Sequence, residues 1–347
     1  NICCNFTFLF YKINWSSDDY IYSFVLLLIY NYLCCIMRTK HFILSVILMS
    51  QLAFAQGQAG SLFLTINPGA RANAMGEAQI GVANDVYATY YNPAGLMNLS
   101  SREFSFMHTS YLPNLVDDMS YDFLTFAMPF QEGKALGGHF TYLNLGDQVS
   151  TDINGNELGS FSSYMYALNL SYAQDIDDTS SFGVNGKYFY QELAVINSLD
   201  ASSGSFAVDI GYFKHNAMDN PNLKLGAVLT NLGPGVSFDD GEEDPLPTRL
   251  GLGISYLALE GLVNVAFDLN YELNDQTIVT NFGAEYFLVE NFALRAGFMS
   301  DPSGDLNYTT VGLGADLGTI GFDVSYVMGG DLDPHSDMVR FSLSGSL

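Results

Sequence analysis

The sequence predicts an all-β fold: a transmembrane antiparallel β-barrel of about fourteen strands that follows an N-terminal plug or hatch segment. From about Arg102 onward, bulky apolar residues alternate with small or polar ones over segments of about ten residues, the length of a tilted membrane strand. Only 14% of the 347 residues are charged, while 14% are aromatic. No apolar run after residue 55 is long enough for a membrane-spanning helix, so in lipid only a closed barrel could satisfy this backbone.

The composition also excludes other classes of protein. The 12 Lys and Arg residues against 37 Asp and Glu give a net charge of −25, so we expect no nucleic acid partner. The hydrophobic fraction of 48% is too high for a disordered chain.

The N-terminal region carries the pattern of a secretory signal peptide over residues 37–55. A short basic start at Met37 to Lys40 precedes the apolar stretch Phe42 to Leu52, and Ala53-Phe54-Ala55 is a small-residue cleavage site. The mature protein is therefore expected to begin at Gln56 and to reach the outer membrane of a Gram-negative bacterium.

Residues 1–36 differ in composition from the rest of the chain. They lack an initial Met and contain the only Trp, Trp15, and all four cysteines (Cys3, Cys4, Cys34 and Cys35). We interpret them as translated sequence upstream of the true start at Met37. The alternative is a membrane helix at Ile21 to Ile36, which is short for a bilayer.

Residues 56–101 lack the alternating pattern and are predicted to be the hatch segment. The turn signals Asn67-Pro68-Gly69 and Asn92-Pro93-Ala94-Gly95 flank a stretch rich in alanine. Such a segment could fold inside the pore as a plug, with the Asn92 turn seated against the inner wall. The alternative is a periplasmic segment packed under the barrel.

Residues 102–347 are predicted to form the barrel. Short connections alternate with long polar ones such as Asp147 to Gly159, Glu192 to Ser203 and Leu232 to Pro247, as expected for periplasmic turns and external loops. The fourteen predicted strands lie near 102–111, 119–128, 134–146, 160–173, 181–191, 204–213, 222–231, 248–258, 261–271, 277–287, 291–300, 308–316, 319–328 and 338–347.

Successive side chains of a strand point to opposite faces, so the alternation predicts which side chains face lipid and which face the lumen. Charged residues are assigned to the lumen, because a charge at mid-bilayer on the lipid face is costly. The side chains predicted to face lipid are Tyr164, Tyr166, Leu168, Phe206, Val208, Ile210, Leu252, Ile254, Phe322 and Val324. The charged side chains predicted to line the lumen are Lys187, Asp209, Arg249, Asp268, Glu285, Arg295 and Asp323.

Two stretches of the hatch segment resemble a known family. FLTINPGARANAMGEA at 63–78 and ANDVYATYYNPAGL at 83–96 are similar to the N-terminal signature of PorV/PorQ outer-membrane proteins, which in turn resemble FadL-type fatty acid channels. The resemblance implies a fourteen-stranded barrel with a hatch and, for PorV-like members, a role in type IX secretion; it does not separate PorV-like from PorQ-like members. The hatch motif comprises Gly69, Ala70, Arg71, Met75, Gly76, Asn92, Pro93, Ala94, Gly95 and Leu96.

The search for catalytic or metal-binding patterns gives little. His108, His139, His215 and His335 are scattered without metal-ligand spacing, and His108 and His139 are interpreted as strand residues rather than catalytic groups. The run 152–157 begins like a calcium loop but lacks its later ligands, so Asn154-Gly155 is better explained as a hairpin turn. No catalytic residue, cofactor or metal is predicted.

One acidic run leaves an alternative open. Asp239, Asp240, Glu242, Glu243 and Asp244 are interpreted as a solvated loop, and the alternative is a divalent cation that bridges them to lipopolysaccharide.

Two functions remain from the sequence. The first is a non-enzymatic docking or anchoring component of type IX secretion, with outer-membrane lipid, secretion-system proteins and secreted cargo as partners. The alternative is a FadL-like channel for hydrophobic small molecules.

Overall fold

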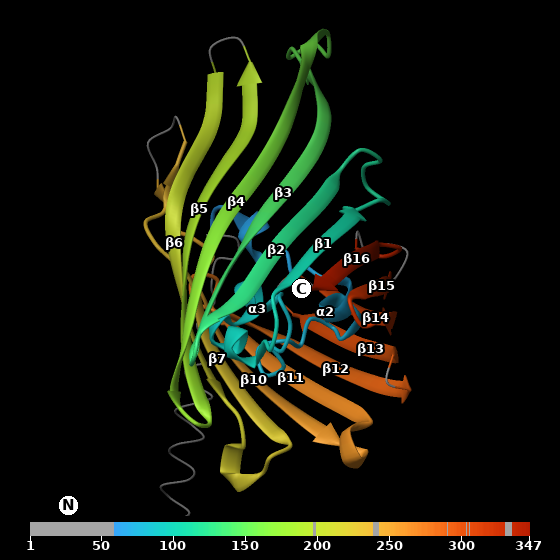
Figure 1. Ribbon diagram of the computed structural model, residues 1–347. Helices are drawn as coiled ribbons and strands as arrows, with labels where there is room; N and C mark the ends of the chain where they lie inside the picture. Colours follow the sequence, from blue (N-terminus) through green and yellow to red (C-terminus); the bar gives the residue numbers. More distant parts are fainter. Residues whose placement is uncertain are drawn as a thin grey trace, which may run out of the picture. The chain divides into compact units, whose positions relative to one another are not determined.

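Fourteen antiparallel strands close into a single barrel in the computed structural model, in which β1 pairs with both β2 and β16 (Figure 1). The structure describes residues 59–196, 199–238, 243–289, 291–302, 304, 306–329 and 335–347. The predicted signal peptide, Trp15, the four cysteines and the acidic residues Asp239, Asp240 and Glu242 therefore lie outside the described residues.

The strands follow the chain around the barrel. They are β1 (Glu103–Ser110), β2 (Ser120–Gln131), β3 (Lys134–Thr151), β4 (Glu157–Asp177), β5 (Ser180–Ile196), β6 (Leu199–Lys214), β7 (Leu223–Leu232), β10 (Arg249–Ala258), β11 (Val263–Glu272), β12 (Thr277–Val289), β13 (Phe292–Asp301), β14 (Leu306–Asp316), β15 (Ile320–Met328) and β16 (Val339–Ser346). A separate two-stranded sheet of β8 (Val236–Ser237) and β9 (Glu243–Asp244) lies in the connection from β7 to β10, and the single-turn helices η4 (Ala217–Asp219) and η5 (Leu259–Gly261) lie in two of the turns.

The predicted number of barrel strands is confirmed, but two predicted loops are wrong. Residues 147–151 and 157–159 extend β3 and β4, and much of Glu192 to Ser203 extends β5 and β6. These stretches continue the backbone ladder beyond the membrane, where neither face needs to be apolar. They therefore lack the alternation on which the prediction depended. The Asn154-Gly155 turn is confirmed, since the amide of Gly155 bonds to the carbonyl of Asp152 and the amide of Asp152 to the carbonyl of Asn156.

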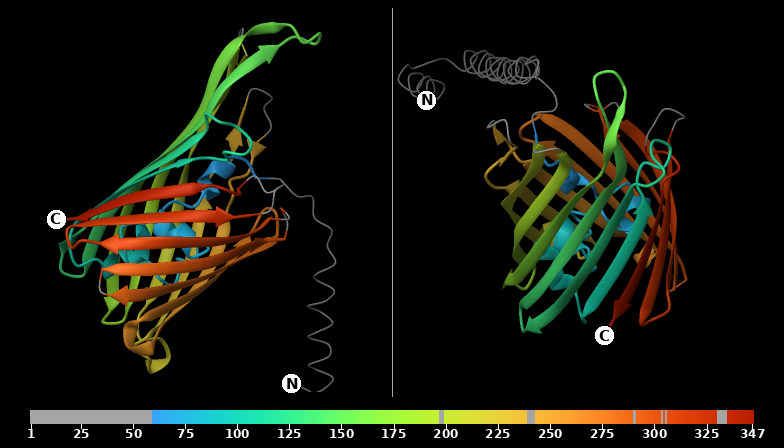
Figure 2. Two further views of the ribbon diagram at one scale, coloured as in Figure 1. Left: turned by 90° about the vertical axis from the view of Figure 1, so that its right-hand side faces the viewer. Right: turned by 90° about the horizontal axis from the view of Figure 1, so that it is seen from above.

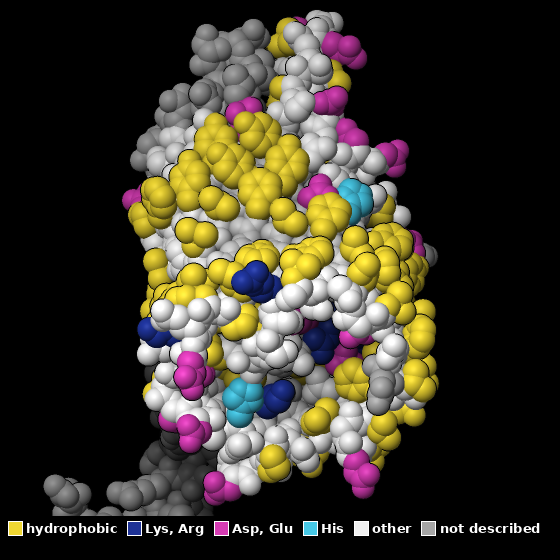
Figure 3. All heavy atoms as spheres, viewed as in Figure 1, with side chains coloured by type: hydrophobic (Ala, Val, Ile, Leu, Met, Phe, Trp, Pro, Cys, Tyr) yellow, Lys and Arg dark blue, Asp and Glu magenta, His cyan; other side chains and the backbone are white. Residues whose placement is uncertain are grey.

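Side chains alternate between a buried inner face and an exposed outer face along the strands. On β6, Phe206, Val208 and Ile210 are exposed while Ala207 and Asp209 are buried. None of the ten residues predicted to face lipid is buried. Figure 3 shows hydrophobic side chains gathered over the wall formed by β2 to β5.

Aromatic side chains mark the outer boundary of the apolar zone on this wall. The rings of Tyr142 and Tyr164 lie 6.2 Å apart, and those of Tyr166 and Tyr190 lie 5.6 Å apart. At the same level a polar pair, His108 and the carboxylate of Asp122, points outward with 2.7 Å between Nδ1 and Oδ1. Because charged groups avoid the lipid face, this row lies at the level of the headgroups.

The two ends of the barrel differ in the length of their connections. The hairpins β3–β4 and β5–β6 rise above the other strands at one end, and short turns close the other (Figures 1 and 2). Long external loops and short periplasmic turns are typical of outer-membrane barrels, so we name these the external and the periplasmic end.

Within the described residues, no helix has the length and apolar character needed to cross a membrane.

Candidate functional site inside the barrel

Residues 59–101 form four short helical turns that lie within the ring of strands (Figure 2). They are η2 (Leu62–Thr65), α2 (Ala70–Ala74), α3 (Ala88–Tyr91) and η3 (Pro93–Asn98). Most of these residues are buried, including Ala70, Met75, Ala94 and Leu96. Helices this short are not stable alone, so contacts with the wall must hold the segment in place.

The two turn signals begin two of these helices. Gly69 precedes α2 with a φ of 94°, a conformation that favours glycine. Asn92 caps η3, since its side-chain oxygen accepts a hydrogen bond from the amide of Ala94, and Pro93 occupies the first helical position. The Asn92 side chain also donates to the carbonyl oxygens of Ile80, at 3.2 Å, and of Tyr212 on β6, at 3.0 Å.

Pairs of glycines on neighbouring strands make room for the segment. Gly183 pairs with Gly211, Gly226 with Gly253, and Gly283 with Gly297. A Cβ atom at any of the six would overlap the segment: residues 92–94 at the first pair, Ile80 and Gly81 at the second, Met75 and Gly76 at the third. The small residues on the inner faces of the strands therefore form the contact surface for residues 59–101.

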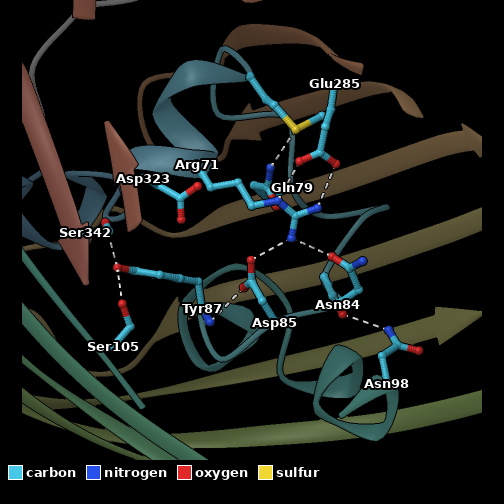
Figure 4. Close-up of polar contacts among 12 residues, drawn as sticks. Arg71, Gln79, Asn84, Asp85, Tyr87, Asn98, Ser105, Glu285, Asp323 and Ser342 are labelled. Carbon is cyan, nitrogen blue, oxygen red and sulfur yellow. Dashed lines mark hydrogen bonds and ion pairs between the residues drawn. The ribbon is translucent and has the colours of Figure 1, made fainter. Parts of the chain in front are cut away.

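Arg71 on α2 forms the centre of a network of charges (Figure 4). Its guanidinium bonds to both carboxylate oxygens of Glu285, at 3.0 and 2.9 Å, and its Nη1 lies 2.8 Å from Asp85 and 2.9 Å from Asn84. Glu285 also accepts a bond of 2.7 Å from Arg295, which reaches Asp323 at 2.6 Å. Burial alone would lower the pKa of Arg71, but the charges of Glu285 and Asp85 outweigh it and raise that pKa, so the guanidinium is always charged.

Hydroxyl groups attach the same part of the segment to the closing strands. The amide of Ala70 donates to Oγ of Ser342 at 2.9 Å, and the Tyr87 hydroxyl lies 3.0 Å from Ser342 and 2.8 Å from Ser105. Burial raises the pKa of the Tyr87 phenol above its ordinary range, so it remains a neutral hydrogen-bonding group. Ser105 and Ser342 lie on β1 and β16, where the barrel closes.

The structure places the remaining predicted lumen charges at three other positions. Asp268 accepts bonds from the amides of Gln79 and Ile80 at 2.6 and 2.7 Å, and thereby holds the turn between α2 and α3. Lys187 lies 3.2 Å from Asp209 and 2.6 Å from Asn231, within the wall itself. Arg249 is half-buried and pairs with Glu272 in the strand register.

Sequence reasoning missed two sets of residues in this site. Arg340, buried on β16, donates to the carbonyl of Asn67 at 2.6 Å and lies 3.6 Å from Glu77. The glycine pairs were also missed as pairs. The sequence could have indicated both sets, because Arg340 and the glycines all occupy the alternating strand positions that face the lumen. The strand register is also needed to show that they contact residues 59–101.

Separate cavities remain at the two ends of the filled lumen. The external one, which we call the vestibule, holds about 680 Å³, and the periplasmic one, between Arg71 and β12 to β16, about 410 Å³. The two share no lining residue. A pocket of only about 10 Å³ lies deeper, beside Phe63, Tyr90 and His139, which is scarcely room for one water molecule.

The two strand histidines lie on opposite faces of the barrel wall. His139 is buried against the rings of Tyr90 and Phe123, and His108 lies on the outer face beside Asp122. No group of three or more His, Cys, Asp or Glu residues that could hold a metal ion occurs in the described ranges. The carboxylate of Asp152, the first residue of the calcium-like run, is bound by the amides of Asn154 and Asn156.

Comparisons with known proteins agree with this architecture. The family described as Type IX secretion system protein PorV matches residues 56–280. The Pseudomonas putida toluene transporter TodX is similar in structure, with a TM-score of 0.59 and 12% identity over 81% of this chain and 99% of that one. The Ralstonia pickettii toluene transporter TbuX has a TM-score of 0.54 and 15% identity, covering 81% and 98%, and a Pseudomonas aeruginosa FadL homologue has 0.53 and 11%, covering 80% and 97%. No curated protein shows significant sequence similarity to the chain.

Proposed function

Because this chain belongs to the PorV family of type IX secretion system proteins, we propose that it docks and anchors secretion partners at the external face of the Gram-negative outer membrane. It is a non-enzymatic outer-membrane barrel of the FadL fold. In this proposal residues 59–101 are a permanent plug, and the barrel serves as a scaffold rather than as a pore.

The observation that carries the proposal is the contrast between a filled lumen and long external hairpins. β3 and β4 have 18 and 21 residues, whereas about 9–11 residues suffice to cross a bilayer. The additional residues, at roughly 3.4 Å each, add about 24–41 Å of strand, measured along the strand, to what the hydrocarbon core needs. This extension provides a surface outside the membrane on which a partner can dock.

The β3–β4 hairpin also presents apolar side chains to solvent. Val149 and Leu158 are 59% and 57% exposed, and Ile153 at the tip is completely exposed. These exposed apolar side chains outside the membrane give a protein partner apolar surface to bury.

The test is affinity purification from native outer membranes with a variant that removes this apolar surface. We expect Val149→Thr, Ile153→Asn and Leu158→Thr together to lose secretion-system proteins and cargo that the wild type retains. Leu115→Asn with Val116→Thr is the matched control, because both residues are exposed apolar residues at the same end, in the β1–β2 connection. Equal recovery of partners with wild type and hairpin variant would refute docking through this hairpin.

A second function, passage of hydrophobic small molecules, is favoured by the vestibule and by likeness to the toluene transporters. It requires the segment inside the barrel to move. Uptake of toluene into proteoliposomes at a rate above that of empty liposomes would support it, and equal rates would exclude it.

A further inference from the structure

One edge of the β3–β4 hairpin is not covered by a neighbouring strand. β2 pairs with β3 only as far as Asn144. Beyond this point β3 rises above the β1–β2 connection and pairs with β4 alone, up to Thr151 (Figure 1). Among the described strands, residues 147–151 therefore have a partner on one side only. An uncovered strand edge presents amide and carbonyl groups with which another chain can pair.

Two hydrogen bonds at opposite ends of this stretch show which amides point to the free edge. The amide of Asp147 donates to a carboxylate oxygen of Asp118, on the side of β2, at 2.9 Å. The amide of Asp152 donates at 2.9 Å to a carbonyl oxygen across the turn, on the side of β4. Backbone groups of successive strand residues point to alternate sides. Both bonds therefore place the amides of Val149 and Thr151 on the free edge.

The backbone groups on this edge are available for pairing. The amides of Val149 and Thr151 have no hydrogen-bond partner among the described residues. The carbonyl groups of these two residues point the same way as their amides. The edge of the other long hairpin differs, because the hydroxyl of Ser205 on β6 donates to the carbonyl of Pro234 at 3.1 Å. The β3 edge is thus open to an added strand, whereas the β6 edge is partly covered.

The side chains of this edge also favour a strand partner. Residues 147–151 contain no proline and no lysine, two residues that commonly protect a strand edge. Val149 and Thr151 are exposed and β-branched, and such residues pair well across strands. An apolar side chain of an added strand could therefore pack beside Val149.

The charge of the hairpin favours a basic partner. Asp147, Asp152 and Glu157 lie on the hairpin, and no Lys or Arg occurs between Lys134 and Lys187. A segment that carries Lys or Arg would therefore be attracted to the hairpin, and an acidic segment would be repelled.

We propose that residues 147–151 of β3 bind an extended, basic segment of a secreted polypeptide as an added β-strand. The segment accepts hydrogen bonds from the amides of Val149 and Thr151 and donates its own amides to the carbonyl groups of the same edge. This inference rests on the proposed docking function and names the chemistry by which the hairpin recognises its partner. Backbone pairing then acts together with the apolar contacts of the hairpin.

Amide hydrogen exchange of the complete barrel in lipid nanodiscs tests the edge itself. Without a partner, the amides of Val149 and Thr151 should be at least about tenfold less protected than those of Gln148 and Ser150, which point toward β4. Equal protection of the two sets would show that the edge is not free and would overturn the proposal.

A synthetic probe tests pairing on this edge. The probe is the capped peptide Lys-Val-Thr-Val-Thr-Val-Lys, and its control has the same side chains but N-methyl groups on its central amides. We expect the probe to slow exchange at Val149 and Thr151 at least about tenfold, and the methylated peptide to leave exchange unchanged. No protection by the probe at millimolar concentration, or equal protection by the methylated peptide, would contradict strand addition.

A pair of variants tests the same edge with the natural partners. Thr151→Pro removes one edge amide and leaves the apolar side chains of the hairpin unchanged, whereas Thr151→Ala retains the amide. We expect the proline variant alone to lose protection by the probe and to recover at least about tenfold less of the secretion-system proteins and cargo from native outer membranes. Slow exchange of the Gln148 amide in both variants would show that the hairpin is intact.

The recovery of partners separates strand addition from docking in general. If the variant of Val149, Ile153 and Leu158 loses partners while Thr151→Pro retains them, docking stands and strand addition is refuted. If both variants retain partners, both proposals are refuted. Equal loss in Thr151→Pro and Thr151→Ala would assign the effect to the side chain and would also refute strand addition.

Discussion

The two halves of the barrel wall hold the internal segment by different physical means. On the β3 to β6 half, η3 packs closely against the backbone at the Gly183–Gly211 pair. Its hydrogen bonds to this half are between uncharged groups. On the β12 to β16 half, the turn after α2 also lies against a glycine pair, Gly283 and Gly297, but here α2 is held in addition by charges and by Ser342. The charged residues are Glu285, Arg295 and Asp323. The first half also carries the long hairpins, whereas β12 to β16 have only 8–13 residues.

This difference has a structural explanation. Close packing on glycine in the first half does not depend on salt or pH. The half with short strands stays within the membrane zone, where low polarity strengthens buried ion pairs. Altered charge should therefore affect the second half alone, whereas added volume at the Gly183–Gly211 pair should affect the first.

The largest effect is expected from Gly183→Leu on β5. Its side chain would overlap Pro93 and Ala94, so η3 should leave the wall, at a cost of about 3 kcal/mol. Protease cleavage within 59–101 should become roughly 100-fold faster. Gly186→Leu on the same strand is the control, because nothing lies within 4 Å of a Cβ atom there. Similar cleavage rates in the two variants would show that the glycine does not seat η3.

A smaller effect is expected from Glu285→Gln on the charged half. In this variant Arg71 still pairs with Asp85, and Arg295 still pairs with Asp323. The free energy that holds α2 in place should therefore fall by roughly 1–3 kcal/mol, less than the roughly 3–5 kcal/mol expected when a buried charge has no partner at all. Amide hydrogen exchange in α2 should rise, with η3 unaffected. The double variant Arg71→Met with Glu285→Met should lose less than the sum of the two single variants. Additive losses would mean that the pair does not act as a unit.

A matched pair of serine substitutions compares the two halves directly. Ser342→Ala leaves the buried amide of Ala70 without its acceptor and should cost about 1–2 kcal/mol. Ser181→Ala removes only one donor to the carbonyl of Ala94 and should cost about 0.5–1 kcal/mol. Amide hydrogen exchange in α2 and in η3 measures the two costs. A larger loss of protection for Ser181→Ala than for Ser342→Ala would contradict the expected order.

The smallest effect concerns the tip of the β3–β4 hairpin. Hydrogen bonds from the side chain and amide of Asn156, and from the amide of Asn154, lower the pKa of Asp152. The carboxylate therefore stabilises the turn above the ordinary Asp value of about 3.9, and this contribution is lost as pH falls through the lowered pKa. Asp152→Ala should speed exchange of the Asn156 amide at pH 7, with no difference once wild-type Asp152 is protonated. A difference that persists in acid would exclude the carboxylate as its cause.

The barrel was predictable from the sequence because lipid imposes a strict alternation, seen for example in Phe206, Val208 and Ile210 against Ala207 and Asp209. The hairpin extensions were not predictable from the sequence. A two-stranded ribbon in water forms its backbone hydrogen bonds with the partner strand whatever its side chains are, so the stretches that contain Gln148 and Ser160 show no apolar alternation. Arg71 was identified by its motif, but its partner Glu285 is 214 positions away. Only the closed register brings such residues together.

The central claim is that residues 59–101 plug a barrel whose lumen has no continuous path. Single-channel conductance of the purified wild-type protein in planar bilayers tests this most directly. The account predicts a closed barrel without steady current for the wild type and for Gly186→Leu, and open, ion-conducting channels for Gly183→Leu. A steady open conductance in the wild type, equal to that of Gly183→Leu, would contradict it.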